Sequence, residues 1–279
     1  MKKNSLRFKL SRAYRRSTGV IRRLPDFVVI GVVKGGSSSI YDYIVQHPMV
    51  TAAIKKEVHY FNKKTFPQRD PIWYQSHFPL SRTLTRSQKL TGEASPEYFH
   101  GQDAPRWMKD LIPDVKLILV LRNPIERAYS HYSMNMRNRQ KKLGLAPQSS
   151  FADIVLPDIE RLRKTRPLSE MMTVEKLQPH GFSYLSSGLY IYSLRRWLKT
   201  FPAEQLLILK SEELFANPEA TTNQAFDFLG LEPYSGQYNV VNAGSYSKLE
   251  PELRQALADF FNPYNQAVYE LLGQDFGWQ

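Results

Sequence analysis

The chain of 279 residues is long enough to bury a sizeable core, and its 42% hydrophobic and 23% charged residues are typical of a globular protein. It contains no cysteine, which excludes disulfides, thiolate metal sites and a cysteine nucleophile. The formal net charge is +12, and it is concentrated at the N-terminus, where residues 1–25 contain nine Lys and Arg side chains and no acid.

This basic N-terminal segment has two readings. It could be a solvated, flexible arm, or it could contact an anionic membrane surface or a polyanionic substrate. Nucleic acid is disfavoured because no recognition motif accompanies the charge, and no stretch is apolar enough for a signal peptide or a membrane-spanning helix. We expect residues 1–24 to be a flexible basic arm and residues 25–279 to be one domain. We expect a cytoplasmic location, with contact at the membrane surface as the alternative for the arm.

Short apolar runs alternate with helical patterns along the rest of the chain. The runs typical of buried strands are 27–33, 49–54, 89–95, 115–121 and 206–210. The helical patterns are 37–46, 125–142, one near 149–166, 183–201, 218–231 and one near 250–272. This alternation predicts an α/β sandwich with a mostly parallel sheet, and ligands of such sheets bind beyond the carboxyl ends of the strands.

A glycine-containing turn, VKGGSSS, joins the first strand to the first helix. The start of a helix presents unpaired backbone N–H groups, the glycines allow close approach, the lysine adds charge and the serines add hydroxyl donors. Together these features favour an anion site over a plain turn. The residues of this loop are Lys34, Gly35, Gly36, Ser37, Ser38 and Ser39. The lysine precedes both glycines, whereas the nucleoside triphosphate motif G-x-x-x-x-G-K-[ST] places it after them.

Three more polar positions are candidates for the same site. Arg122 follows the strand at 115–121, and Ser130 lies about two helical turns further on, so together they could hold a second phosphate. Glu57 stands among Lys55, Lys56 and His59, which could form a surface ion-pair cluster or hold a general base among cations. The six histidines show no metal-ligand spacing such as H-E-x-x-H, so no metal site is expected.

Several segments together resemble the sulfotransferases that use 3′-phosphoadenosine 5′-phosphosulfate (PAPS), in the carbohydrate branch that includes heparan sulfate enzymes. The segments are PDFVVIGVVKGGSSSIYDYIVQHPMV with KKEVHYF, GEASPEYF, LILVLRNPIERAYSHY, SGLYIYSLRRWLKTFP with LLILKSEEL, and YELLGQDFGW. The resemblance covers residues 25–279. It implies a P-loop-like three-layer fold and transfer of a sulfuryl group from PAPS to a hydroxyl, less often an amine, of a glycan, glycolipid or related acceptor, without a metal.

The resemblance also implies roles for particular residues. The loop from Lys34 to Ser39 would surround the 5′-phosphosulfate, with Lys34 also catalytic, and Arg122 and Ser130 would hold the 3′-phosphate. Glu57 would be the catalytic base and His59 a neighbouring active-site residue.

The chain departs from the family pattern in places. Ala94 stands where related glycan enzymes often have a lysine, and VNAGSYSKL lacks the basic loop expected near residue 248. The C-terminal disulfide of the family is impossible here because cysteine is absent. Two alternatives remain at this stage: a P-loop kinase or NTPase, which would need a magnesium-binding acid, and a non-catalytic polyanion-binding protein that uses the basic arm.

Overall fold

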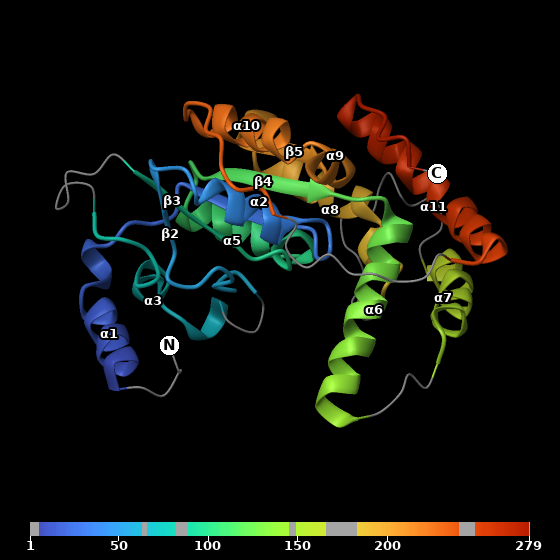
Figure 1. The fold of residues 1–279 in the computed structure, drawn as a ribbon, viewed down its shortest axis with the longest axis horizontal. Coiled ribbons are helices and arrows are strands. Elements are labelled where there is room, and N and C mark those ends of the chain that lie inside the picture. The colour runs from blue at the N-terminus through green and yellow to red at the C-terminus, as the bar shows by residue number, and fades with distance from the viewer. Residues whose placement is uncertain are drawn as a thin grey trace.

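A sheet of parallel strands forms the centre of the chain (Figure 1). The computed structural model describes residues 6–62, 66–81, 89–144, 149–165, 183–239 and 249–278. The strands are β1 (Phe27–Gly31), β2 (Val50–Ala52), β3 (Leu90–Ala94), β4 (Lys116–Leu121) and β5 (Leu206–Lys210). Their order is β2-β3-β1-β4-β5, and each neighbouring pair is parallel. This arrangement confirms the predicted α/β fold class and the five predicted strand runs.

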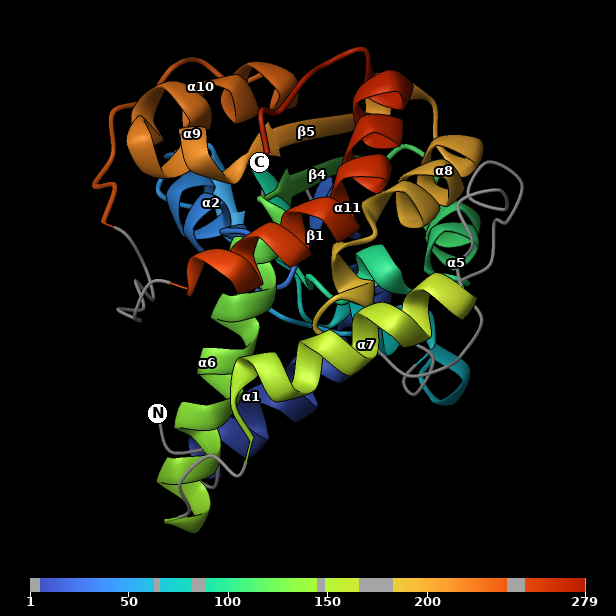
Figure 2. The same cartoon turned by 90° about the vertical axis from the view of Figure 1, so that its right-hand side faces the viewer.

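Helices cover both faces of the sheet and complete a three-layer sandwich (Figures 1 and 2). Alternate side chains of β1 point to opposite faces, so Phe27 and Val29 pack in one core while Val28 and Ile30 pack in the other. The first core also receives side chains of α2 (Ser37–Ile44), α9 (Ser211–Ala216) and α10 (Pro218–Leu229). The second receives side chains of α3 (Pro71–Gln75), α5 (Ala104–Leu111), α6 (Pro124–Leu143), α7 (Phe151–Thr165), α8 (Tyr190–Thr200) and α11 (Pro251–Leu272).

Short 3₁₀ helices connect several of these elements. They are η1 (Gly19–Ile21), η2 (Phe66–Gln68), η3 (Tyr98–His100), η5 (Ser186–Gly188) and η6 (Ala203–Gln205). The single long helix predicted over 183–201 is wrong in its first part, because η5 and α8 are separated at Leu189, whose φ of −80° and ψ of 67° are not helical. Gly188 is closely packed at this point, since a Cβ atom on it would lie 2.9 Å from Pro124 and from Phe261.

The N-terminal segment forms α1 (Leu6–Ser17) and η1 beside α3 (Figure 1). Arg15 donates hydrogen bonds from Nε to the carbonyl of Ser76 at 2.7 Å and from Nη2 to the carbonyl of Phe78 at 2.6 Å. Arg22 is buried and donates to the same Phe78 carbonyl at 3.0 Å. Polar contacts therefore join the segment to residues 76–78. Within the described ranges, the structure contains no helix of the length and apolar character needed to cross a membrane.

Parallel strands bring distant loops to one edge of the sheet. The loops that follow the carboxyl ends of β1, β2, β3 and β4 begin at residues 32, 53, 95 and 122. These loops contain or adjoin the glycine turn, Glu57, Ser95 and Arg122. The fold therefore gathers the candidate residues where α/β sheets bind their ligands.

Candidate active site

The loop after β1 has a backbone that requires its glycines. Gly36 is the N-cap of α2 and has a φ of 105°, in the left-handed region that glycine tolerates best. Gly35 lies so close to β4 that a Cβ atom on it would be 2.6 Å from the carbonyl oxygen of Val120. The first intrahelical bond runs from Ile40 N–H to the Gly36 carbonyl at 3.0 Å, so the N–H groups of the three preceding serines have no partner inside the helix. They are available to an anion.

Lys34 and Arg122 meet at this loop. Lys34 has a φ of 70°, and Nη1 of Arg122 donates to its carbonyl oxygen at 3.1 Å. Arg122 follows β4, and its own carbonyl accepts a hydrogen bond from the Tyr190 hydroxyl at 2.8 Å. The next residue, Asn123, caps α6 and accepts a hydrogen bond from Ile125 N–H at 2.9 Å. Two cations from neighbouring strands therefore lie beside the helix start that favours an anion.

Ser130 is buried on α6, about two turns from the start of that helix. The next residue, His131, has a pKa lowered to about 4 by burial, then by the charge of Arg127 and then by that of Lys34. The positive potential of Lys34 therefore extends to the part of α6 that contains Ser130. The contact of Ser130 with a 3′-phosphate remains a prediction.

The segment after β2 places Glu57 between two basic side chains. Nε2 of His59 lies 3.2 Å from Oε2 of Glu57, and Nζ of Lys56 lies 3.6 Å from Oε1. Lys56 also donates a hydrogen bond to the Ser38 hydroxyl in the first turn of α2. Lys56 thus joins the proposed anion loop to the proposed base, a role that no sequence motif indicates.

These contacts shift the pKa values of Glu57 and His59 in opposite directions. The hydrogen bond from His59 lowers the pKa of Glu57, and burial opposes this effect less strongly. The same bond raises the pKa of His59, with a further contribution from the charge of Glu97. Glu57 is therefore a carboxylate near neutral pH, the form that can accept a proton.

A fully buried carboxylate supports the segment that carries Glu57 and His59. Oε2 of Glu93 accepts hydrogen bonds from Val58 N–H at 3.1 Å and from the Ser95 hydroxyl at 2.6 Å. Oε1 of Glu93 accepts from two tyrosine hydroxyls, Tyr74 at 3.0 Å and Tyr98 at 2.9 Å. Burial raises the pKa of Glu93, and these four hydrogen bonds oppose the rise.

Ser95 extends this support to His59. Its hydroxyl oxygen accepts from His59 N–H at 3.0 Å, and His59 has a left-handed φ of 59°. Non-glycine residues adopt this conformation when surrounding contacts hold it. The GEASPEYF motif therefore fixes the backbone beside Glu57, a role that the resemblance of this segment to the family did not indicate.

The fold and this arrangement agree with a comparison to known proteins. Residues 24–248 match the family described as "Sulfotransferase domain". The chain belongs to the sulfotransferase family. This finding confirms the resemblance drawn from the sequence motifs, and it identifies the protein as a PAPS-dependent sulfotransferase. It supports neither the kinase nor the non-catalytic alternative.

Individual relatives of this sulfotransferase are similar over most of its length. "Heparan sulfate glucosamine 3-O-sulfotransferase 6" is 30% identical in Homo sapiens and 32% identical in Mus musculus, in each case over 92% of this chain and 74% of that protein. "Membrane-associated sulfotransferase kil1" of Dictyostelium discoideum is 25% identical, over 94% of this chain and 68% of that protein. A crystal structure of a sulfotransferase from Alicyclobacillus acidocaldarius superposes with a TM-score of 0.68 at 27% identity, covering 91% of this chain and 98% of that one.

Ala94, where the family pattern often has lysine, is buried at the end of β3 in this sulfotransferase. Its N–H donates to the carbonyl oxygen of Lys56 at 3.0 Å. The backbone of Lys56, in the loop after β2, thus lies beside the position where the family pattern often has lysine. The other departure, VNAGSYSKL, lies almost entirely outside the described residues.

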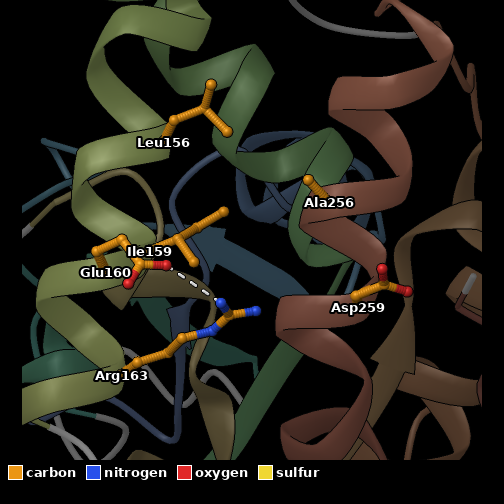
Figure 3. Close-up of a pocket in the computed structure, with 6 residues that line it drawn as sticks. All are labelled: Leu156, Ile159, Glu160, Arg163, Ala256 and Asp259. Atoms are coloured by element: carbon orange, nitrogen blue, oxygen red, sulfur yellow. Dashed lines mark hydrogen bonds and ion pairs between the residues drawn. The ribbon is translucent and has the colours of Figure 1, made fainter.

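A hollow elsewhere on the sulfotransferase contains none of these residues. It lies between α7 and α11, and an ion pair of 3.2 Å joins Arg163 to Glu160 on its α7 side (Figure 3). The lining residues are Leu156, Ile159, Glu160, Arg163, Ala256 and Asp259. In the parts of the chain that the structure describes, no three His, Cys, Asp or Glu side chains gather as a metal site.

Proposed function

We propose that this sulfotransferase transfers the sulfuryl group of PAPS to a hydroxyl group of a glycan or glycolipid, with Glu57 as general base. The observation that carries the proposal is the position of Lys56, which contacts Ser38 on the anion loop and Glu57 on the neighbouring loop. A donor anion bound at the start of α2 and an acceptor hydroxyl beside Glu57 would therefore be separated only by the side chain of Lys56. The heparan sulfate 3-O-sulfotransferases among the relatives support a glycan hydroxyl as acceptor.

The donor side of the site has the charge and shape that PAPS requires. The loop from Lys34 to Ser39 offers helix-start N–H groups and hydroxyls to the phosphosulfate, and Gly35 and Gly36 leave no Cβ in the way. Arg122 and Ser130 are assigned to the 3′-phosphate. Lys34 and Lys56 would stabilise the negative charge that develops on the leaving phosphate oxygen, so we propose that no metal takes part.

On the acceptor side, Glu57 removes the proton of the attacking hydroxyl. The acceptor oxygen forms a new bond to sulfur while the bond between sulfur and the phosphate oxygen breaks. The products are a sulfate ester and 3′,5′-ADP, and the proton is left on Glu57. His59 orients the carboxylate through the contact at Oε2 and keeps it ionised before attack.

Sulfate transfer from labelled PAPS tests the proposal directly. The purified protein would be incubated with [³⁵S]PAPS and separate pools of glycans, glycolipids, small alcohols and amines, without added metal and with a chelator present. We expect label in an alkali-stable, hydroxyl-linked sulfate ester of a glycan or glycolipid. Transfer only to amines, or turnover that requires a divalent metal, would contradict the proposed acceptor or mechanism.

The organisation of the chain also belongs to this proposal. Residues 25–279 would be the catalytic domain and residues 1–24 an appended basic arm in a cytoplasmic protein that contacts a membrane surface. The name of the relative kil1 describes that protein as membrane-associated, which supports a surface location here.

A further inference from the structure

Exposed apolar side chains share one side of helix α1. Leu10, Ala13, Tyr14 and Ser17 recur at helical spacing on this side, and all four are exposed. Arg15 lies on the opposite side and is the half-buried residue that bonds the carbonyls of Ser76 and Phe78. Among the side chains of α1 that the structure describes, residues 10–17, the apolar ones therefore face outward.

Contacts after α1 hold this orientation. Arg23 N–H donates to the Pro79 carbonyl at 3.1 Å, and Ser81 N–H donates to the Ile21 carbonyl at 2.9 Å. Gly19 lies so close to α3 that a Cβ atom on it would be 2.3 Å from the side chain of Ile72. The contacts of η1 and of Arg15 therefore hold the outward orientation, and α1 cannot turn Leu10 inward without breaking these contacts.

The exposed apolar surface continues from α1 into η1. Leu10 is 59% exposed, Tyr14 is 58% exposed and Val20 is 65% exposed. Ile21 is also exposed. Large apolar side chains grouped in this way mark an interaction surface more often than scattered single residues do. We name this set, Leu10, Ala13, Tyr14, Val20 and Ile21, the outer face.

Positive charge lies beside the outer face. Arg16 is exposed on α1 and flanks this face. Residues 1–25 contain nine Lys and Arg side chains with no acid, and of these Arg15, Arg22 and Arg23 bond the protein itself. Apolar residues that enter a lipid interface, flanked by cations that attract anionic headgroups, are the features of a helix that lies on a membrane. A sulfated polysaccharide would pair with the cations but would leave Leu10 and Val20 exposed to water. The combination therefore favours lipid over a polyanionic chain.

We propose that the outer face of α1 and η1 docks on the surface of an anionic lipid bilayer, with Leu10, Tyr14 and Val20 in the interface and Arg16 against lipid headgroups. The helix lies on the membrane and does not cross it. This docking is independent of the transfer chemistry, because none of its residues belongs to the active site.

Vesicle sedimentation tests the docking surface in the full-length protein. The probes are phosphatidylcholine vesicles with and without phosphatidylserine. We expect binding that needs phosphatidylserine and weakens with salt. The double variant Leu10→Ser/Val20→Ser should bind roughly tenfold more weakly, and Arg16→Gln roughly fivefold more weakly. Leu271→Ser is the matched control, since Leu271 is also an exposed leucine but lies at the end of α11, on the side of the molecule opposite α1 in Figures 1 and 2. It should bind like the wild type.

Two further measurements separate the proposal from its rivals. Affinity for 3′,5′-ADP should be unchanged in Leu10→Ser/Val20→Ser and in Arg16→Gln, which shows that their active sites are folded. Binding to a sulfated polysaccharide should be insensitive to Leu10→Ser/Val20→Ser. The proposal is overturned if the wild type does not bind the anionic vesicles. It is also overturned if Leu10→Ser/Val20→Ser binds them normally, which would leave a polyanion site made by the cations alone.

Discussion

Nε2 of His59 lies 3.2 Å from Oε2 of Glu57, so the residue proposed as base is held by a neighbour two positions along the chain. The backbone of that neighbour is fixed in turn by Ser95, which bonds the buried Glu93. Glu57 itself is only half-buried. Its position thus depends on a buried hydrogen-bond network more than on its own burial.

Replacing Glu57 with Gln removes the proton acceptor and keeps the shape of the side chain. We expect turnover to fall roughly 10²–10⁴-fold, the usual contribution of a general base, while the affinity for 3′,5′-ADP stays the same. Steady-state transfer assays and titration calorimetry measure the two quantities. Glu97→Gln is the matched control, because Glu97 lies 3.7 Å from the other ring nitrogen of His59 but is exposed. Comparable losses of turnover in Glu57→Gln and Glu97→Gln would show that Glu57 is not the general base.

Replacing His59 with Asn should move the acid limb of the pH profile. Glu57 must be ionised to act, so kcat/KM falls as the pH drops through its pKa. His59 is the largest cause of the lowered pKa of Glu57, and without it that pKa rises. The acid limb should therefore shift to higher pH. An unshifted limb, measured over the same pH range as the wild type, would mean that Glu57 is not the group that titrates.

Lys34→Ala and Arg122→Ala should each weaken the binding of 3′,5′-ADP. Hydrogen bonds to charged groups contribute about 1.5–3 kcal/mol, which corresponds to roughly 10–100-fold in Kd. Calorimetry at fixed salt measures the change, and Arg106→Ala provides the control because Arg106 is an exposed arginine on α5. The assignment of the two phosphate sites fails if both variants bind 3′,5′-ADP like the wild type.

Most of the fold could be predicted from the sequence because buried parallel strands are short, apolar and bounded by turns. The predicted run 115–121 and the strand β4 differ by one residue. The break at Leu189 could not be predicted, because the apolar spacing on both sides of it is helical. Gly188, beside the break, packs closely against Pro124 and Phe261, which are distant in sequence.

The sequence predicts the candidate site only where its residues follow the carboxyl ends of strands that are neighbours in the sheet. Lys34 and Arg122 end neighbouring strands, and the structure places Arg122 against the carbonyl of Lys34. The support of Glu57 by Glu93 was not predictable, because it depends on β3 lying between β1 and β2 in the sheet. That order brings residues 93–95 beside residues 56–59, and no periodicity in the sequence encodes it.

Lys56 offers the sharpest test of this placement, because the chain provides a neighbouring lysine as its control. Lys56 contacts Ser38 and Glu57, whereas Lys55 is exposed. We expect Lys56→Ala to lower kcat by roughly 10²-fold, the effect of losing one preorganised group that stabilises charge in the transition state, and Lys55→Ala to stay near the wild type. Steady-state kinetics with saturating PAPS make the comparison. Equal effects would show that only the overall charge of the loop matters, whereas a selective loss in Lys56→Ala would place its ammonium group at the transferred sulfuryl.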